Sequence, residues 1–282
     1  MINPKKRKKK CIVGNIIDGT KLDLPLPQPH TLVSGTTGSG KSSWVNSLIG
    51  AWADQNVIMY GIDLKDGLEL NLWEQRFEQI ATTPQQATQL LTQLRTIIGE
   101  RSNKLHENNM RLWDETLGAW LVFIVDELAE LSSMPADLLA EAIQTPLEDK
   151  SVNAQIKRAK DELGWRQSLI ASLARISRAA GVTIVCATQH PLANIVGSDL
   201  RANLNGRISC RHNNPEGIDV GLGTGNRHLE KEIPENKPGT AHIMHLAGHH
   251  KPILARCYKT DETAIQKRAQ TTTKPTTQGE IS

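Results

Sequence analysis

Residues 35–42 form the most distinctive chemical motif of the chain, and they read GTTGSGKS. They fit the pattern G-x-x-x-x-G-K-S/T, follow an apolar run at 31–34 and lead into a segment that is predicted to be helical. Glycines let backbone N–H groups curve around phosphates, and the start of a helix adds positive potential. Lys41 would reach the outer phosphates of a triphosphate, and Ser42 would give its hydroxyl to Mg²⁺. The predicted contacts with this nucleotide are Gly35, Thr36, Thr37, Gly38, Ser39, Gly40, Lys41, Ser42 and Ser43.

Two adjacent carboxylates, Asp126 and Glu127, follow an apolar run at 120–125. Such a run predicts a buried strand, and ligands of open α/β sheets bind at the carboxyl ends of the strands. We expect Asp126 to hold Mg²⁺ through its water shell, and Glu127 to orient or deprotonate the water that attacks the γ-phosphate of ATP. The pattern therefore predicts an ATP hydrolase that uses ATP and Mg²⁺. A binding-only nucleotide switch would have no need of a positioned base.

Two further apolar runs extend the predicted site. The run at 57–62 ends at Asp63 and lies between the other two in the sequence, so we interpret it as one strand interposed between the phosphate-loop strand and the acidic strand. An interposed strand, together with a glutamate beside the magnesium-binding aspartate, is typical of the additional-strand, RecA-like NTPases. The run at 182–187 delivers Gln189 to the same edge, where its amide could sense the γ-phosphate or the attacking water.

The order of apolar runs and helical patterns predicts the α/β class, and more narrowly a RecA-like P-loop NTPase fold with a mostly parallel central sheet flanked by helices. The clearest helix is expected at about 84–106, where apolar residues recur at steps of three and four. A charged stretch at 147–165 is interpreted as another helix. Late runs near 207–210, 241–246 and 252–258 predict strands, the last two of them antiparallel.

Charge and composition limit the partners of the chain without naming them. The formal net charge is +3, and six consecutive cations at 5–10 supply +6, so the other residues carry the difference, −3. The overall charge is therefore not enough to predict that the chain binds nucleic acid. No apolar run approaches the roughly 18 to 20 residues that span a bilayer, and no secretory signal is visible, so we expect a cytoplasmic protein. The four scattered cysteines are expected to be reduced.

Five segments, in this order, resemble the motor domain of the FtsK/SpoIIIE family of DNA translocases, including the shorter relatives carried on conjugative elements. They are HTLVSGTTGSGKS at 30–42, GIDLKDGLEL at 61–70, FIVDELAEL at 123–131, SRAAGV at 177–182 and CATQHP at 186–191. The likeness covers about residues 12–265, where the ATPase motor domain is expected. A basic arm at 1–11 and a polar tail at 266–282 are expected to be disordered, because such segments have little apolar surface to bury.

The resemblance implies an ATP-dependent motor that moves double-stranded DNA, in conjugative transfer or in chromosome or plasmid segregation. It implies a homo-oligomeric ring, usually a hexamer, with nucleotide bound at each subunit junction. Arg207 stands where the family places an arginine that completes the neighbour's site, and Arg178 is the second choice. The loops after Glu127 and at 191–200 would line the pore. A membrane or secretion-channel partner would come from another chain.

Two alternative functions would use the same ATP-hydrolysing chemistry. One is a coupling ATPase that delivers DNA to a secretion channel with little movement of its own. The other is a RecA-like ATPase that acts on protein substrates.

The sequence also departs from the family's pattern. The family's usual proline after the Asp63 position is Leu64 here, as in the conjugative branch. In the loop that carries the predicted sensor Gln189, the family commonly has an arginine before the proline, and this chain has His190 there. A role for that arginine side chain is therefore not carried over. The charged stretch at 147–165 also exceeds the family's usual length.

Overall fold

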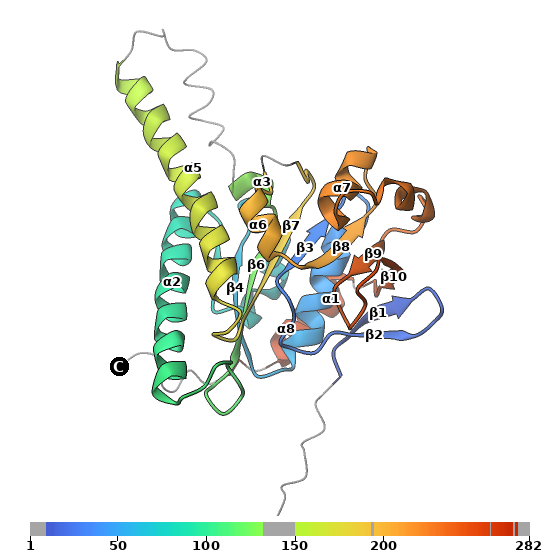
Figure 1. The fold of residues 1–282 in the computed structure, drawn as a ribbon, viewed down its shortest axis with the longest axis horizontal. Coiled ribbons are helices and arrows are strands. Elements are labelled where there is room, and N and C mark those ends of the chain that lie inside the picture. Colours follow the sequence, from blue (N-terminus) through green and yellow to red (C-terminus); the bar gives the residue numbers. More distant parts are fainter. Residues whose placement is uncertain (1–9, 132–149, 193–194, 260, 273, 276–282) are drawn as a thin grey trace, which may run out of the picture.

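The computed structural model describes residues 10–131, 150–192, 195–259, 261–272 and 274–275. In these residues ten strands form one sheet, in the order β2-β1-β10-β9-β8-β3-β7-β6-β4-β5, with helices packed against it (Figure 1). The strands are β1 (Ile12–Ile16), β2 (Lys21–Asp23), β3 (Thr31–Ser34), β4 (Val57–Ile62), β5 (Gln79–Ala81), β6 (Trp120–Val125), β7 (Val182–Thr188), β8 (Gly206–Cys210), β9 (Thr240–Met244) and β10 (Ile253–Cys257). The helices are α1 (Lys41–Ala53), α2 (Pro84–Glu107), α3 (Leu128–Leu131), α5 (Lys150–Ile176), α6 (Ser198–Asn203), α7 (Pro215–Leu222) and α8 (Glu262–Thr271), with 3-10 segments η1 (Leu70–Arg76) and η2 (Arg227–Glu232).

The part of the sheet that carries the predicted site is parallel. β3 pairs with β8 on one side and β7 on the other, and the order continues through β6, β4 and β5, all in parallel. The strands from β9 to β2 extend the sheet in antiparallel fashion. Every residue of β3, β6 and β7 is buried, as expected of strands with both faces covered. The α/β class with helices around a mostly parallel sheet is confirmed.

The interposed strand is a different one from the strand predicted. β7 lies between β3 and β6, whereas β4, the strand at 57–62, lies on the far side of β6. A run of apolar residues shows that a strand is buried, but it does not show which strands are its neighbours. The additional-strand arrangement is present, and the strand that creates it is the one that leads to Gln189.

Each face of the sheet is covered by its own helices. α1 packs on one face and inserts Trp44 and Trp52 into a core shared with β1 and β10. α2 and α5 lie side by side over the other face (Figure 1), where Leu91 and Leu173 join one apolar cluster. The phosphate-loop strand is therefore held from both sides.

The predicted helix at 84–106 is confirmed as α2. Thr83 caps its first turn in a capping box, which satisfies N–H groups that have no partner within the helix. Arg101 lies in its apolar stripe and is buried, with hydrogen bonds to the main-chain oxygens of Ala119 at 3.0 Å and Ala180 at 3.3 Å. Its guanidinium lies 4.4 Å from the ring centroid of Trp113. A cation at this position thus joins α2 to the loops that precede β6 and β7.

The charged stretch at 147–165 is helical from residue 150, where α5 begins, and residues 147–149 lie outside the described residues. α5 extends well beyond the sheet at its amino end (Figure 1). None of the helices in the described ranges combines the length and the apolarity needed to cross a bilayer.

The boundary predicted at residue 266 is wrong. α8 continues to residue 271, and its Ile265 and Ala269 are buried in the cluster that contains α1. Two apolar residues four positions apart are too few to reveal a helix within a polar segment. Cys11, assigned to the arm, is also buried, and its N–H donates to Asp23 at 2.7 Å. The rest of the predicted arm and tail lies mostly outside the described residues.

Candidate functional site

The loop between β3 and α1 has a conformation that favours glycine at two neighbouring points. Gly38 and Gly40 have φ angles of 76° and 97°, in the left-handed region that side chains disfavour. Gly40 is also crowded, since a Cβ there would lie 2.0 Å from the backbone nitrogen of Gly239, whereas nothing lies within 4 Å of a Cβ at Gly38. The N–H of Gly239 donates to the main-chain oxygen of Ser39 at 2.9 Å. The turn before β9 therefore braces the loop.

The first residues of the loop are tied to neighbouring strands. The N–H of Gly35 donates to the main-chain oxygen of Thr188 at 3.2 Å, and that of Thr36 to Arg211 at 3.0 Å. The N–H of Ser39 donates within the loop, to the main-chain oxygen of Thr36 at 3.1 Å, so three of the predicted phosphate-binding N–H groups are engaged within the protein. Ser43 lies in the first turn of α1 and is half-buried.

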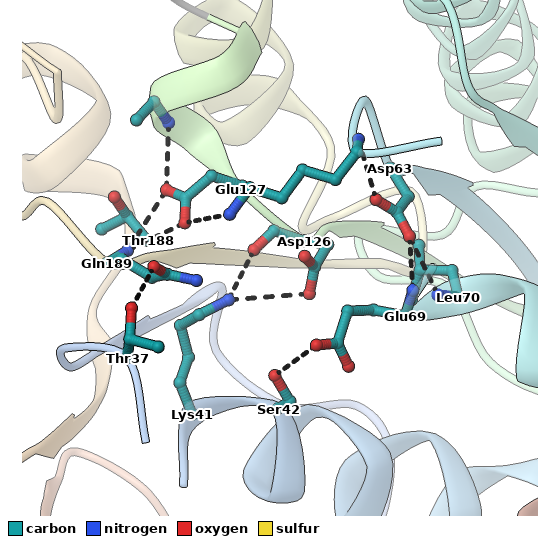
Figure 2. A network of polar contacts seen from close by, with 12 residues as sticks. Thr37, Lys41, Ser42, Asp63, Glu69, Leu70, Asp126, Glu127, Thr188 and Gln189 are labelled. Carbon is teal, nitrogen blue, oxygen red and sulfur yellow. Dashed lines mark hydrogen bonds and ion pairs between the residues drawn. The ribbon is translucent and has the colours of Figure 1, made fainter. Parts of the chain in front are cut away.

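Lys41 begins α1 and reaches the end of β6 (Figure 2). Its Nζ donates a hydrogen bond of 2.9 Å to the main-chain oxygen of Asp126 and lies 3.6 Å from Oδ1 of the same residue. Burial raises the pKa of the Asp126 carboxyl to about 6; Lys41 opposes this rise, and the carboxylates of Asp63, Glu69 and Glu127 add to it. The edge of the sheet is therefore a place where negative charge is concentrated.

Glu127 is only 4% exposed, and both of its oxygens accept hydrogen bonds (Figure 2). Oε1 accepts from the N–H groups of Ala129 at 3.3 Å and Gln189 at 3.2 Å. Oε2 accepts from the same Gln189 N–H at 3.0 Å and pairs with Nζ of Lys65 at 3.4 Å. Residues that follow β4, β6 and β7 thus converge on one carboxylate.

Gln189 connects this carboxylate to the phosphate loop. While its N–H donates to Glu127, its side-chain Oε1 accepts a hydrogen bond of 2.8 Å from the hydroxyl of Thr37 (Figure 2). The structure therefore brings together four of the five predicted catalytic residues, which are Lys41, Asp126, Glu127 and Gln189.

Three residues of the turn after β4 join the site and were assigned no role from the sequence. Asp63 is buried and accepts hydrogen bonds from the N–H groups of Lys65 at 3.2 Å, and of Glu69 and Leu70 at 3.0 Å each. The turn directs Lys65 to Glu127, as described above, and Glu69 to Ser42, whose hydroxyl donates to Oε1 of Glu69 at 3.0 Å. The sequence could have indicated this turn, because Asp63 follows an apolar run just as Asp126 does.

The oxygen atoms near Ser42 suit Mg²⁺, which prefers hard oxygen ligands and retains several waters. Oδ1 of Asp126 is buried and accepts no hydrogen bond from the described residues. Such an oxygen can accept a hydrogen bond from a water molecule that a cation holds. Ser42 and Asp126 therefore fit the ion that the phosphate loop implies.

The two predicted arginines lie away from these residues. Arg207 is the second residue of β8 and pairs with Leu32, whereas the phosphate loop begins after the last residue of β3. Its Nη2 donates to the main-chain oxygen of Arg201 at 2.6 Å. Arg178 lies in the turn before β7, at the other end of the parallel strands from Gln189. Neither arginine contacts the chain's own phosphate loop in the described residues.

Several proteins are similar to this chain over most of its length. The model of the FtsK/SpoIIIE family matches residues 6–119. A sporulation regulatory protein from Streptomyces azureus is 30% identical over 227 residues, which cover 76% of this chain and 67% of that protein. The chain belongs to the FtsK/SpoIIIE family.

Other family members are considerably longer than this chain. A DNA translocase FtsK from Sporosarcina ureae is 28% identical over 73% of this chain but only 26% of its own length. Transfer protein TraSA from Streptomyces ambofaciens is 28% identical over 76% of this chain and 51% of its own length. The chain thus spans about a quarter of one relative and about half of the other.

Solved structures share the fold. The pCW3 conjugation coupling protein TcpA, in a monomer form with ATPγS, has a TM-score of 0.73 and 23% identity, over 94% of this chain and 71% of that one. The cytoplasmic domain of the type VII secretion ATPase EccC from Thermomonospora curvata has a TM-score of 0.65 and 19% identity, over 95% of this chain and 31% of that one. At such identities the likeness concerns the fold alone.

Gly40→Ala is expected to destabilise the protein more than Gly38→Ala. Both substitutions place a side chain at positive φ, which costs about 1–2 kcal/mol, but only the first forces the turn at Gly239 to move. Urea unfolding should give Gly40→Ala the lower midpoint of the two. Equal midpoints would show that the close approach of Gly239 does not constrain the loop.

Proposed function

We propose that this chain is an ATP-dependent double-stranded DNA translocase, a ring-forming motor that hydrolyses ATP with Mg²⁺. The observation that supports this most strongly is that Lys41, Asp126 and Glu127 meet at one sheet edge in a member of the FtsK/SpoIIIE family. Phosphate loops occur in many nucleotide-binding proteins, whereas hydrolysis also needs a group that orients the attacking water. The relatives named DNA translocase FtsK and Transfer protein TraSA favour DNA as the substrate.

In this proposal the phosphate loop and Lys41 hold the triphosphate, while Ser42 and Asp126 hold Mg²⁺. The ion, when bound, would neutralise charge on the phosphates and on the transferring group. Lys41 is already buried beside Asp126, so its ammonium needs little rearrangement to meet the outer phosphates. Such a preplaced charge is effective because little reorganisation is needed during the reaction.

Glu127 must release one of its present partners before it can align water. Both of its oxygens accept hydrogen bonds from protein groups, and among these the Lys65 ammonium is the side chain that can move most freely, since it is half-buried. Gln189 contacts both Glu127 and Thr37, so a phosphate that displaced the Gln189 amide would also disturb the carboxylate. We propose that Gln189 acts as the γ-phosphate sensor in this way.

The segments that would contact DNA follow the same strands as the catalytic residues. One begins after Glu127 with α3, and the other spans 191–200 and leads into α6. Residues of both helices line a single pocket together with α5. A shift at the γ-phosphate could therefore reach both segments. Parts of each segment, at 132–149 and 193–194, lie outside the described residues.

We propose further that the ring is a hexamer and that Arg207 acts on the nucleotide of a neighbour. A residue that acts in trans has no need to approach its own phosphate loop, and Arg207 does not. Burial lowers the pKa of Arg207 to about 10, so the side chain stays charged at neutral pH. Its Nη1 is buried and has no hydrogen-bond partner among the described residues. The side chain as a whole is only half-buried, so part of it stays accessible to a neighbouring subunit.

Purified protein is expected to hydrolyse ATP faster when linear duplex DNA is added. Lys41→Ala should lose nucleotide binding and turnover, because the buried cation for the outer phosphates is gone. Glu127→Gln should keep nucleotide binding and lose turnover by about 10²-fold or more, because an amide is a poor general base. Phosphate release and nucleotide affinity, measured on the same samples, check both variants.

The alternatives give different results in this assay. Stimulation by a polypeptide and indifference to DNA would favour a protein-directed ATPase, and DNA stimulation without movement along DNA would favour the coupling role. Normal turnover by Glu127→Gln would show that another group aligns the water.

Arg207→Ala is expected to bind nucleotide as the wild type does but to form inactive rings. Mixing it with Glu127→Gln should restore part of the turnover, because some junctions would then combine an intact Glu127 with an intact Arg207. Wild-type turnover by Arg207→Ala alone would rule out the trans role. Arg178→Ala, which removes the second candidate for the trans role, is measured in the same way for comparison.

A further inference from the structure

The hydroxyl of Ser42 has a partner that the sequence did not suggest. A hydroxyl carries one proton and two lone pairs. Here the proton is donated to Oε1 of Glu69 at 3.0 Å, which leaves both lone pairs of Oγ available to a cation (Figure 2). Oδ1 of Asp126, at the end of β6, accepts no hydrogen bond from the described residues.

The position of Glu69 is fixed by the fold. Its N–H donates to Oδ2 of Asp63 at 3.0 Å, as does the N–H of Leu70, where η1 begins. Asp63 is itself buried at the end of β4. A carboxylate that accepts several backbone hydrogen bonds orders the turn around it, so the Glu69 side chain starts from a defined point opposite α1.

We infer that Glu69 is a positioning residue of the Mg²⁺ site, whose carboxylate orients the Ser42 hydroxyl toward the ion. The inference rests on the proposed function, because it assumes that Mg²⁺ and nucleotide bind at this loop. Outer groups that orient a metal ligand typically change metal affinity by 10–100-fold when they are removed. The Glu69 carboxylate also adds negative charge to the sheet edge that carries Asp126 and Asp63.

Glu69→Ala is expected to reduce, by about 10–100-fold, the gain in ATPγS affinity that Mg²⁺ provides. Affinity for ATPγS in EDTA should be unchanged, since Glu69 would act through the ion. Glu69→Gln keeps an acceptor oxygen for Ser42 and should lose less than Glu69→Ala. Calorimetric titrations of ATPγS with Mg²⁺ and with EDTA measure both quantities without requiring turnover.

Asp66→Asn is the matched control. Asp66 is exposed on the same turn and has a φ of 55°, a conformation that asparagine tolerates, so the variant removes one negative charge and should leave the Mg²⁺-dependent gain intact. Thermal unfolding of each variant tests whether the turn persists.

The outcomes separate the inference from the proposed function. A Glu69→Ala protein that gains as much affinity from Mg²⁺ as the wild type overturns the inference, as does a loss of equal size with Mg²⁺ and with EDTA. A loss as large in Glu69→Gln as in Glu69→Ala overturns the acceptor role. Wild-type protein that fails to bind ATPγS with Mg²⁺ would instead remove the proposed function.

Discussion

The insertion of β7 between β3 and β6 is the constraint on which the candidate site depends. Neighbouring strands lie about 4.8 Å apart, so the phosphate-loop strand and the acidic strand are separated by roughly 10 Å. Lys41 spans part of this gap and reaches Asp126, while Gln189, directly after β7, occupies the middle. In the proposed function, the γ-phosphate and the attacking water would lie on this side of the sheet, between the loop and Glu127.

The same arrangement concentrates charge that the fold alone does not balance. Asp63, Asp126 and Glu127 are all buried at this edge, beside the buried Lys41. Burying charged groups costs free energy unless they are paired, and here backbone N–H groups and two lysines supply only part of the compensation. Bound Mg²⁺ would supply more. In the proposed function, the site would exchange some stability of the isolated chain for affinity for Mg²⁺, a common feature of functional sites.

The sequence was most informative where chemistry depends on adjacent residues. The loop at 35–42 and the pair Asp126 and Glu127 are local patterns, and the fold places them together as expected. Lateral strand order is a property of the whole sheet, so the interposed strand was misassigned. The link between Glu69 and Ser42 joins residues 27 positions apart in the sequence, and only the Asp63 turn brings them together. Asp63 follows a predicted strand, and ligands of open α/β sheets bind at the carboxyl ends of strands. That rule would have indicated that the turn belongs to the site, though not which contacts its residues make.

Movement along duplex DNA distinguishes a translocase from an ATPase that only binds DNA. A triplex-forming oligonucleotide bound near one end of a linear duplex is released when a motor travels along that duplex. We expect ATP-dependent release by the wild-type chain, and none when ATPγS replaces ATP or when Glu127→Gln is used. If DNA stimulates hydrolysis but the triplex stays in place, the result contradicts the proposal that this sheet edge is the ATPase site of a translocase.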